Sequence, residues 1–265
     1  MALMDYMTTK KDELVGWIRK FSLFPYPFVT ACCGMLYRVT ARENPEINGS
    51  WICNKGFDQH KLPARKRTLS PALGDAPVSM KQALAKAREL IAGARSPAAL
   101  VSAQGSNEEL DAFKAALGAR FRVYAREDSV PQPGEVVEDD FLIKADKNPN
   151  SFGVRERFGW RTITAADAIA HDLFLVWGDW DDYEMFGRAR VIHLASFARQ
   201  GDRHADVHIP LSTTFERSGS FCNFEGKRNR FDKVLDKPPL VEHAADVFAQ
   251  LEAELAGLQQ LPEAS

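Results

Sequence analysis

The sequence is poor in cysteine and has no excess of either charge. Four cysteines in 265 residues are too few for a disulfide-built scaffold. Lys and Arg total 34 against 36 Asp and Glu, and the resulting net charge of -2 excludes a dedicated nucleic-acid binder. With 45% hydrophobic and 26% charged residues, the composition is that of an ordinary globular protein rather than a disordered one.

Long apolar runs are also missing. The most apolar stretch, residues 21–37, is interrupted by Pro25 and Pro27 and falls short of the roughly 20 residues that span a membrane. Residues 1–20 mix acidic and basic side chains and contain no secretory signal. We therefore expect a cytoplasmic chain whose thiols are reduced.

Familiar cofactor and catalytic motifs are absent as well. The sequence contains no GxGxxG, P-loop, HExxH or GxSxG pattern. Two turns do follow predicted strands, Gln104-Gly105-Ser106-Asn107 and Gly178-Asp179-Trp180-Asp181. Each is able to present backbone N–H groups to an anion at a helix N-terminus. The spacing favours the plainer interpretation, that these are tight strand-to-helix turns in which glycine is needed.

From residue 79 onward, helix-like and strand-like runs alternate. Capping boxes begin three of the helices, at Ser79 with Gln82, Ser106 with Glu109 and Thr164 with Asp167. We expect Gly93 to end the first helix in the left-handed conformation. The expected helices are 79–93, 106–118, 164–169, 180–186 and 241–258, and the expected strands are 98–103, 121–125, 173–177, 190–194 and 206–209. This order predicts an α/β fold with a Rossmann-like layered, mostly parallel sheet.

Composition divides the chain into four parts. Residues 1–36 form an N-terminal segment with a short helical pattern and a Pro/aromatic stretch. Residues 37–78 are irregular and carry a basic run at 61–67. We interpret this run as a solvated face of the protein or as a contact at the rim of a site. Residues 79–240 form the α/β domain, and residues 241–265 are a C-terminal helix and tail.

The cysteines and one histidine pattern are the possible metal ligands. Cys32 and Cys33 are adjacent, Cys53 and Cys222 lie far from them, and no Cys-x-x-Cys pair occurs. From spacing alone, buried structural cysteines are favoured over cluster ligands. His204, Asp206 and His208 alternate, so on a strand they would share one face; a solvated edge strand is favoured over a metal site.

Several segments resemble a known family. Residues 42–56 read R-E-N-P-E-I-N-G-S-W-I-C-N-K-G, residues 205–210 read A-D-V-H-I-P and residues 219–227 read G-S-F-C-N-F-E-G-K. Together with residues 143–150, they resemble the molybdopterin oxidoreductases and the G subunit of NADH-quinone oxidoreductase (complex I). The resemblance places Cys53 at the last cysteine of that family's iron–sulfur segment. The family's C-x2-C-x3-C opening is missing here.

A second resemblance concerns the N-terminal segment. Residues 17–35, with the tandem Cys32-Cys33, resemble the start of the B subunit of the same enzyme. There, the tandem cysteines ligate a terminal [4Fe-4S] cluster together with two further cysteines. Those two have no counterpart here, because Cys222 is followed by Asn223 rather than proline. The abrupt change near Met35 and Leu36 is typical of a fusion or of a truncated assembly.

The resemblance implies where a cofactor would lie. Asn223, Glu225, Gly226 and Arg228 would line the family's pterin-side pocket, which we expect to hold no molybdenum. Cys32, Cys33 and Cys53 would supply an incomplete ligand set for a [4Fe-4S] cluster, to be completed by a fourth group.

The resemblance implies an accessory or scaffold component of a complex I-type respiratory assembly, without catalysis of its own. Its partners would be other complex I-type subunits, and it would meet the membrane only through them. The alternative is an iron–sulfur or molybdopterin-dependent electron-transfer oxidoreductase component that completes its site with a partner chain.

Overall fold

A seven-stranded, mostly parallel sheet forms the centre of the computed structural model, which describes residues 27–32, 35–126, 133–140, 143–179, 183–198 and 205–259. The strand order is β4-β3-β9-β8-β7-β5-β6. Neighbours from β9 to β6 pair in parallel, whereas β3 pairs antiparallel with both β9 and β4. In sheet order the strands are Ala76–Pro77, Ala72–Leu73, Val207–Pro210, Arg190–Ala195, Leu173–Trp177, Pro97–Ser102 and Arg122–Arg126. The expected α/β fold is confirmed.

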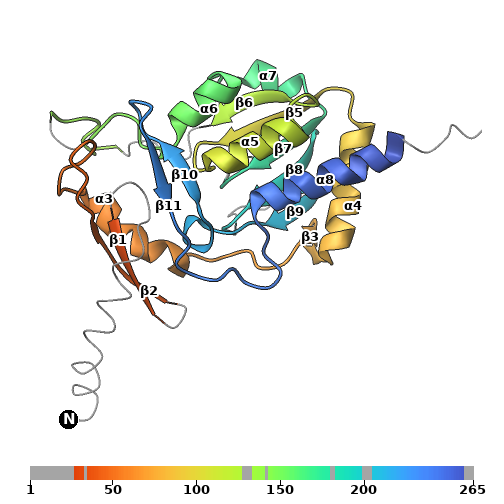
Figure 1. The fold of residues 1–265 in the computed structure, drawn as a ribbon. Helices are drawn as coiled ribbons and strands as arrows, with labels where there is room; N and C mark the ends of the chain where they lie inside the picture. Colours follow the sequence, from red (N-terminus) through yellow and green to blue (C-terminus); the bar gives the residue numbers. More distant parts are fainter. Residues whose placement is uncertain are drawn as a thin grey trace, which may run out of the picture.

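Helices cover both faces of the sheet (Figure 1). On one face lie α4 (Met80–Gly93), α5 (Asn107–Ala116) and α8 (Ala244–Gln259), with α8 in contact with the other two. Helix α6 (Ser151–Phe158) packs beside α5 and β6. The short helix α7 (Ala165–Ile169) and the 3-10 turn η2 (Glu184–Phe186) contact each other.

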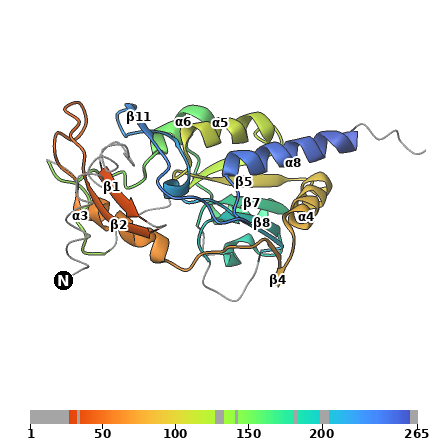
Figure 2. The ribbon, with the colours of Figure 1, turned by 60° about the horizontal axis from the view of Figure 1, so that its bottom comes forward.

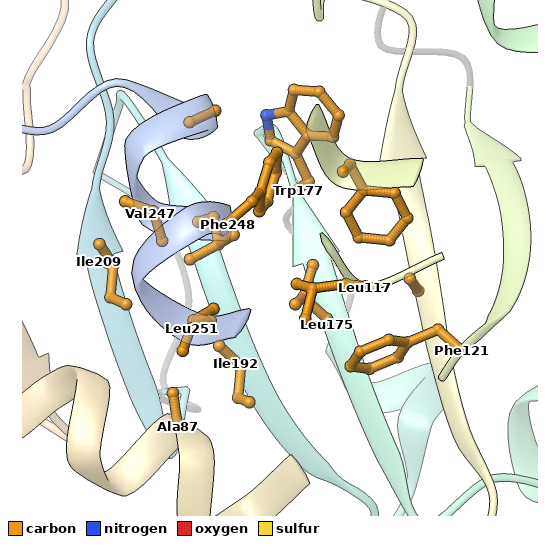
Figure 3. Close-up of a cluster of buried hydrophobic side chains, with 14 of the residues drawn as sticks. Ala87, Leu117, Phe121, Leu175, Trp177, Ile192, Ile209, Val247, Phe248 and Leu251 are labelled. Atoms are coloured by element: carbon orange, nitrogen blue, oxygen red, sulfur yellow. The ribbon is translucent and has the colours of Figure 1, made fainter. Parts of the chain in front are cut away.

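Alternate residues of the central strands enter two separate cores. In β5, Ala99 and Val101 belong to the larger core, whereas Ala98 and Leu100 belong to the smaller one with Phe186. This is the period of two that a strand requires when both of its faces are buried. Figure 3 shows the larger core, where Val247, Phe248 and Leu251 of α8 lie against β7, β8 and β9. Helix α8 on one face and the 3-10 turn η2 on the other are therefore packed against the sheet by apolar side chains.

The three helix starts that were predicted from capping boxes are confirmed, but one predicted helix end is wrong in detail. Each of the three capping boxes has both of its hydrogen bonds. Helix α4 does end at Gly93, yet the chain leaves it through Ala94 in an extended conformation, and Gly93 has no positive φ. The following N–H groups of Arg95 and Ser96 instead bond to the carboxylate of Asp172. Because the chain passes directly into β5, a left-handed turn is not needed.

Other element boundaries move by a few residues. The helix expected over 180–186 is a 3-10 turn at Glu184–Phe186 in the described part, and residues 180–182 lie outside it. Gly187 ends this turn with a φ of 55°. Helix α8 begins at Ala244 rather than at residue 241. Among the described helices, none is long and apolar enough to cross a membrane.

The N-terminal part forms its own small layer at one end of the molecule (Figures 1 and 2). Strands β1 (Pro27–Cys32) and β2 (Met35–Ala41) form a hairpin, and β2 contacts α3 (Asn54–Phe57) and the 3-10 helix η1 (Asp58–Ala64). A second hairpin, β10 (Gly219–Cys222) with β11 (Arg228–Phe231), follows the 3-10 turn η3 (Thr214–Glu216). Buried Val39 and Phe215 form a third apolar cluster that joins these parts.

Candidate functional site

The strand order reverses between β5 and β7. From β5 the chain crosses over through α5 to β6 on one side, and β7 then pairs with the other side of β5. In open α/β sheets, ligands bind beyond the carboxyl ends of the strands at such a reversal. The turns at Gln104–Asn107 and Gly178–Asp179 are the continuations of β5 and β7, so they are neighbours at this position. Here Gly105 lies so close to the Trp177 indole that an added Cβ would be 2.6 Å from Cη2.

Three backbone donors of the first turn are used within the chain. The N–H groups of Gln104 and Gly105 donate to Ser102, at 3.0 and 3.2 Å, and the N–H of Ser106 donates to Glu109 Oε2 at 2.9 Å. Glu108 and Glu109 also place two carboxylates in the first turn of α5. These internal acceptors support the plainer interpretation of the turn, a tight strand-to-helix connection rather than an anion site.

Asn150 occupies the space beyond the end of β5. It is fully buried, its N–H donates to Ala103 O at 3.1 Å, and its Nδ2 donates to Gly105 O at 2.8 Å. Its Oδ1 accepts from the N–H of Cys222 at 2.8 Å. The neighbouring Gly153 leaves room for this amide, because an added Cβ would lie 2.4 Å from Asn150 Oδ1. The Asn150 side chain thus joins the turn after β5 to strand β10.

Glu108 attaches the second hairpin to the same edge. Its carboxylate accepts from the N–H and the hydroxyl of Ser220, both at 2.7 Å. Burial acts to raise the pKa of Glu108, but the hydrogen bonds from Ser220 and the charge of Arg228 outweigh it, so the pKa lies below the ordinary value. The ionised carboxylate therefore holds β10 against the start of α5.

Two buried arginine–glutamate pairs connect the carboxyl ends of the strands. Arg217 lies 3.2 Å from Glu109 and donates to Gln104 O and Ser212 O, each at 2.9 Å. Arg67 forms a two-pronged pair with Glu216 at 2.8 and 3.1 Å. Their side chains are no more than 12% exposed.

The basic run at 61–67 is partly internal. We expected a solvated face or a rim contact, and solvation is wrong for Arg67: its side chain is largely buried, and its Nε donates to Ser196 O at 3.0 Å, beyond the end of β8. Arg65 lies over the Phe197 ring at 4.3 Å and pairs with Asp179 at 3.6 Å. The run therefore attaches the N-terminal layer to the sheet, because the guanidinium groups of Arg65 and Arg67 bind residues that follow strands β7 and β8 or lie near their ends.

The four residues expected to line a pterin-side pocket form the tip of the β10–β11 hairpin. Asn223 Oδ1 accepts from the N–H groups of Glu225 and Lys227, at 3.0 and 2.8 Å. Gly226 has a φ of 81°, and an added Cβ would lie 2.8 Å from the Phe152 ring. Glu225 and Arg228 are exposed. Turn geometry accounts for the asparagine and the glycine, and a role for these residues in cofactor binding stays a prediction.

The cysteines divide between two places. Cys53 is half-buried and lies just before α3. Cys222, the last residue of β10, is buried beside Asn107 of α5. Cys33 lies outside the described residues, and only the backbone of Cys32 is described, at the end of β1. Within the described ranges, no three His, Cys, Asp or Glu side chains come together as metal ligands. The described residues alone do not fit a [4Fe-4S] cluster, which stays a prediction that depends on Cys32, Cys33 and Cys53.

The expected solvated edge at 204–208 is wrong for the residues that the structure describes. Strand β9 lies inside the sheet, between β3 and β8, and the Asp206 carboxylate accepts from the N–H of Val191 at 2.8 Å. Burial lowers the pKa of His208 to about 4. His193 lies beside it, with ring centroids 5.3 Å apart. His204 is outside the described residues.

A polar cluster that the sequence did not reveal lies at the opposite edge of the sheet. Ser96 Oγ is 3.0 Å from His171 Nδ1, and Tyr124 Oη lies 2.9 Å from His171 Nε2 while donating to Asp167 at 3.1 Å. This arrangement resembles a nucleophile with an oriented base. The only signal in the sequence was that Ser96 and His171 come just before strands.

The surroundings of Ser96 argue against acyl-transfer chemistry. The N–H groups of Arg95 and Ser96, which would serve as oxyanion donors, bind the Asp172 carboxylate at 2.8 and 3.0 Å. We therefore assign the cluster a structural part, which is to connect the amino ends of β5, β6 and β7.

The fold and this site define a class: an α/β layered protein in which side chains of the chain itself bind backbone carbonyls at the strand reversal. No family model matches the chain. Over short stretches, the chain is similar to the B subunit of NADH-quinone oxidoreductase. The B subunit of Pelobacter propionicus is 71% identical over 41 residues, which are 16% of this chain and 25% of the relative. A B subunit of Sorangium cellulosum is 58% identical over 36 residues, 14% of this chain and 19% of the relative.

These matches are partial. The chain spans about a quarter or less of the length of these two relatives. The similarity found is to the B subunit, so the resemblance to the G subunit and to molybdopterin oxidoreductases rests on the motifs alone. One solved structure, the formyltransferase/hydrolase complex FhcABCD from Methylorubrum extorquens in complex with methylofuran, covers 72% of this chain and 99% of the matched chain. Its TM-score is 0.47 at 12% identity, a likeness too weak to carry an argument.

Proposed function

We propose that the chain is an accessory or scaffold component of an NADH-quinone oxidoreductase (complex I)-type assembly and has no catalysis of its own. The observation that carries this proposal is that two side chains of the chain itself bind backbone carbonyls at the strand reversal. Asn150 and Arg217 bond to the carbonyls of Gly105 and Gln104, where an α/β enzyme would bind its ligand. The short, highly identical match to the B subunit supports the choice of assembly.

The proposal includes the finer features implied by the motifs. The α/β part would be a reduced molybdopterin-oxidoreductase core, as in the G subunit, without molybdenum. The partners would be other complex I-type subunits, and contact with the membrane would be made through them. Contacts within the chain at this edge fit a core that is retained for its shape, because Glu108, Arg217 and Arg67 each pair with groups of the chain itself.

The test is deletion of the gene from the organism that encodes it, followed by complementation. A tagged full-length chain should co-purify with other complex I-type subunits under anaerobic conditions, and deletion should lower the NADH-quinone reductase activity of the membranes. The Cys53→Ser chain should restore both assembly and activity. A chain that isolates without any such partner would refute the proposal.

A second function is favoured by the position of Cys53. This half-buried thiol lies just before α3, which contacts the hairpin whose first strand ends at Cys32. A partner chain that supplied the missing donors would make this protein an iron–sulfur or molybdopterin-dependent electron-transfer component. In that case, the Cys53→Ser chain would assemble but would lack both activity and an EPR signal from a reduced cluster. The same complementation therefore separates the two functions.

A further inference from the structure

Two adjacent valines are exposed on a short acidic loop. The loop comprises residues 133–140, with the sequence P-G-E-V-V-E-D-D, and contains no basic side chain. Val136 is 58% exposed and Val137 is 53% exposed. A single exposed apolar side chain is ordinary on a protein surface, but a group of them with polar residues around it is typical of a contact surface. We call residues 133–140 the valine loop.

Contacts within the chain hold the valine loop on both sides of the valines. Before them, Glu135 pairs with Lys55 of α3 at 2.7 Å. After them, the N–H of Asp139 donates to Ile143 O at 2.9 Å, and the Asp139 carboxylate accepts from the N–H of Ile143 at 2.7 Å. Figures 1 and 2 both show this part of the chain at the same end of the molecule as α3. The loop therefore has a defined position, from which the valine side chains face solvent.

The lysines that follow the valine loop are also used within the chain. Lys147 donates to the backbone carbonyls of Val137 and Lys144, at 2.6 and 2.5 Å. The Lys144 ammonium lies 5.9 Å from the centre of the Phe224 ring, within the range of a cation–π contact. These contacts leave the acidic side chains of the loop without lysine partners from this segment.

Two carboxylates of the valine loop remain available to another molecule. Glu138 and Asp140 are exposed, and within the described part of the chain neither is paired with a basic side chain. Because they follow the valines closely, a contact through Val136 and Val137 would have a negatively charged rim. The complementary surface is an apolar pocket flanked by Lys or Arg. Nucleic acids and anionic membranes do not fit, because they carry the same sign of charge as the loop.

We propose that the valine loop is the docking surface for a partner subunit with a basic rim: Val136 and Val137 fill an apolar pocket, and Glu138 and Asp140 pair with lysine or arginine beside it. This inference rests on the proposed function, which supplies the partner, another complex I-type subunit. Since contacts within the chain already hold the loop, little further ordering is needed when it binds.

The experiment is anaerobic purification of the tagged full-length chain and its variants from the organism that encodes it. Val136→Ser combined with Val137→Ser should reduce the co-purified complex I-type subunits at least about tenfold. Glu138→Lys should do the same, because it places a like charge opposite the basic rim. In the wild-type assembly, a carbodiimide, which joins carboxylates to adjacent lysines, should link Glu138 or Asp140 to a lysine of one of those subunits.

The matched controls are Ile169→Ser and Glu252→Lys. Ile169 is 82% exposed on α7, and Glu252 is exposed on α8, so both lie outside the valine loop. Each control should retain the partner subunits at the wild-type level. Thermal unfolding of every purified variant should give the wild-type Tm, which shows that a loss of partners is not a loss of fold.

The outcomes separate this inference from the proposed function. If the valine and Glu138 variants carry the same subunits as the wild-type chain, the contact lies elsewhere: the inference is overturned and the proposed function stands. If the wild-type chain carries none of these subunits, both are overturned. If the valine changes only separate copies of the purified chain from one another in sedimentation, the loop joins two copies, and the inference is again overturned.

Discussion

Gly105 shows how closely the edge of the sheet is packed. An added Cβ would lie 2.6 and 2.8 Å from two atoms of the buried Trp177 indole. We predict that Gly105→Ala lowers the free energy of unfolding by about 1–3 kcal/mol, because the core must shift to admit the methyl group. Urea unfolding followed by circular dichroism measures this change.

The control for this prediction is Gly93→Ala. Gly93 is the last residue of α4 and has no heavy atom within 4 Å of an added Cβ. Here alanine should raise the free energy of unfolding by about 0.4–1 kcal/mol, because it restricts the unfolded chain. If both variants changed stability equally, close packing at Gly105 would not be the cause.

His208 should make the protein sensitive to mild acid. Its pKa is about 4 in the folded chain because burial disfavours the charged ring, against 6.5 for an exposed histidine. Between pH 6.5 and 4 the unfolded chain binds the proton and the folded chain does not, so stability falls as pH falls. The loss should approach about 3 kcal/mol at pH 4 and then level off.

Chemical unfolding of the wild-type and His208→Gln chains across this range tests the prediction. The free energy of unfolding of the wild-type chain minus that of the variant should fall by about 3 kcal/mol from neutral pH to pH 4. The carboxylates whose pKa is lowered, such as Asp111 and Asp167, contribute below this window and cancel in the comparison. A difference that is constant from neutral pH down to about pH 4 would contradict the assignment to His208.

At the scale of single elements, the helix starts depend on short-range contacts. Ser79 and Gln82 form both hydrogen bonds of a capping box at the start of α4. We predict that Ser79→Ala lowers the free energy of unfolding by about 0.5–2 kcal/mol, whereas Ser79→Gly costs only a few tenths. Thermal unfolding shows which of the two variants is less stable. Equal losses of stability would show that the Ser79 hydroxyl is not the stabilising group.

Local rules explain what the sequence predicted well. A capping box involves groups within four residues, so Ser106 with Glu109 could be recognised without knowing the fold. The order of helix-like and strand-like runs can also be read from short stretches of sequence, and this order predicted the parallel sheet. The left-handed end at Gly93 was wrong because Asp172, a residue far along the chain, binds the N–H groups of Arg95 and Ser96.

At the scale of the whole molecule, buried pairs link distant parts of the chain. Arg67 and Glu216 lie 149 positions apart, and nothing local in the sequence announces the pair. The same holds for Asn150, which meets both Gly105 and Cys222. The sequence predicted that the turn at 104–107 follows a strand, but it could not predict which side chains fill the space above it.

The Arg67–Glu216 pair yields a prediction at this scale. Arg67→Met should lower the free energy of unfolding by about 3–5 kcal/mol, because it leaves the Glu216 carboxylate buried and without its partner. The double variant with Glu216→Leu should recover much of that loss. A double-mutant cycle by urea unfolding measures the coupling.

The surface pair of Lys86 and Glu89 is the comparison for this cycle. Its side chains are 38% and 66% exposed, so its coupling should not exceed about 1 kcal/mol. Equal coupling energies for the two pairs would show that burial does not determine how strongly the paired side chains are coupled.

The pairing of Ala72 with His208 also bears on how the protein is made on the ribosome. These partners in β3 and β9 are separated by 208 − 72 = 136 positions. At roughly 5–20 residues per second, the β3–β4 hairpin waits on the order of ten seconds before its neighbour is synthesised. During that delay, the early strands have no sheet to join, so newly made chains would be most exposed to misassociation, and most dependent on chaperones, before translation reaches β9.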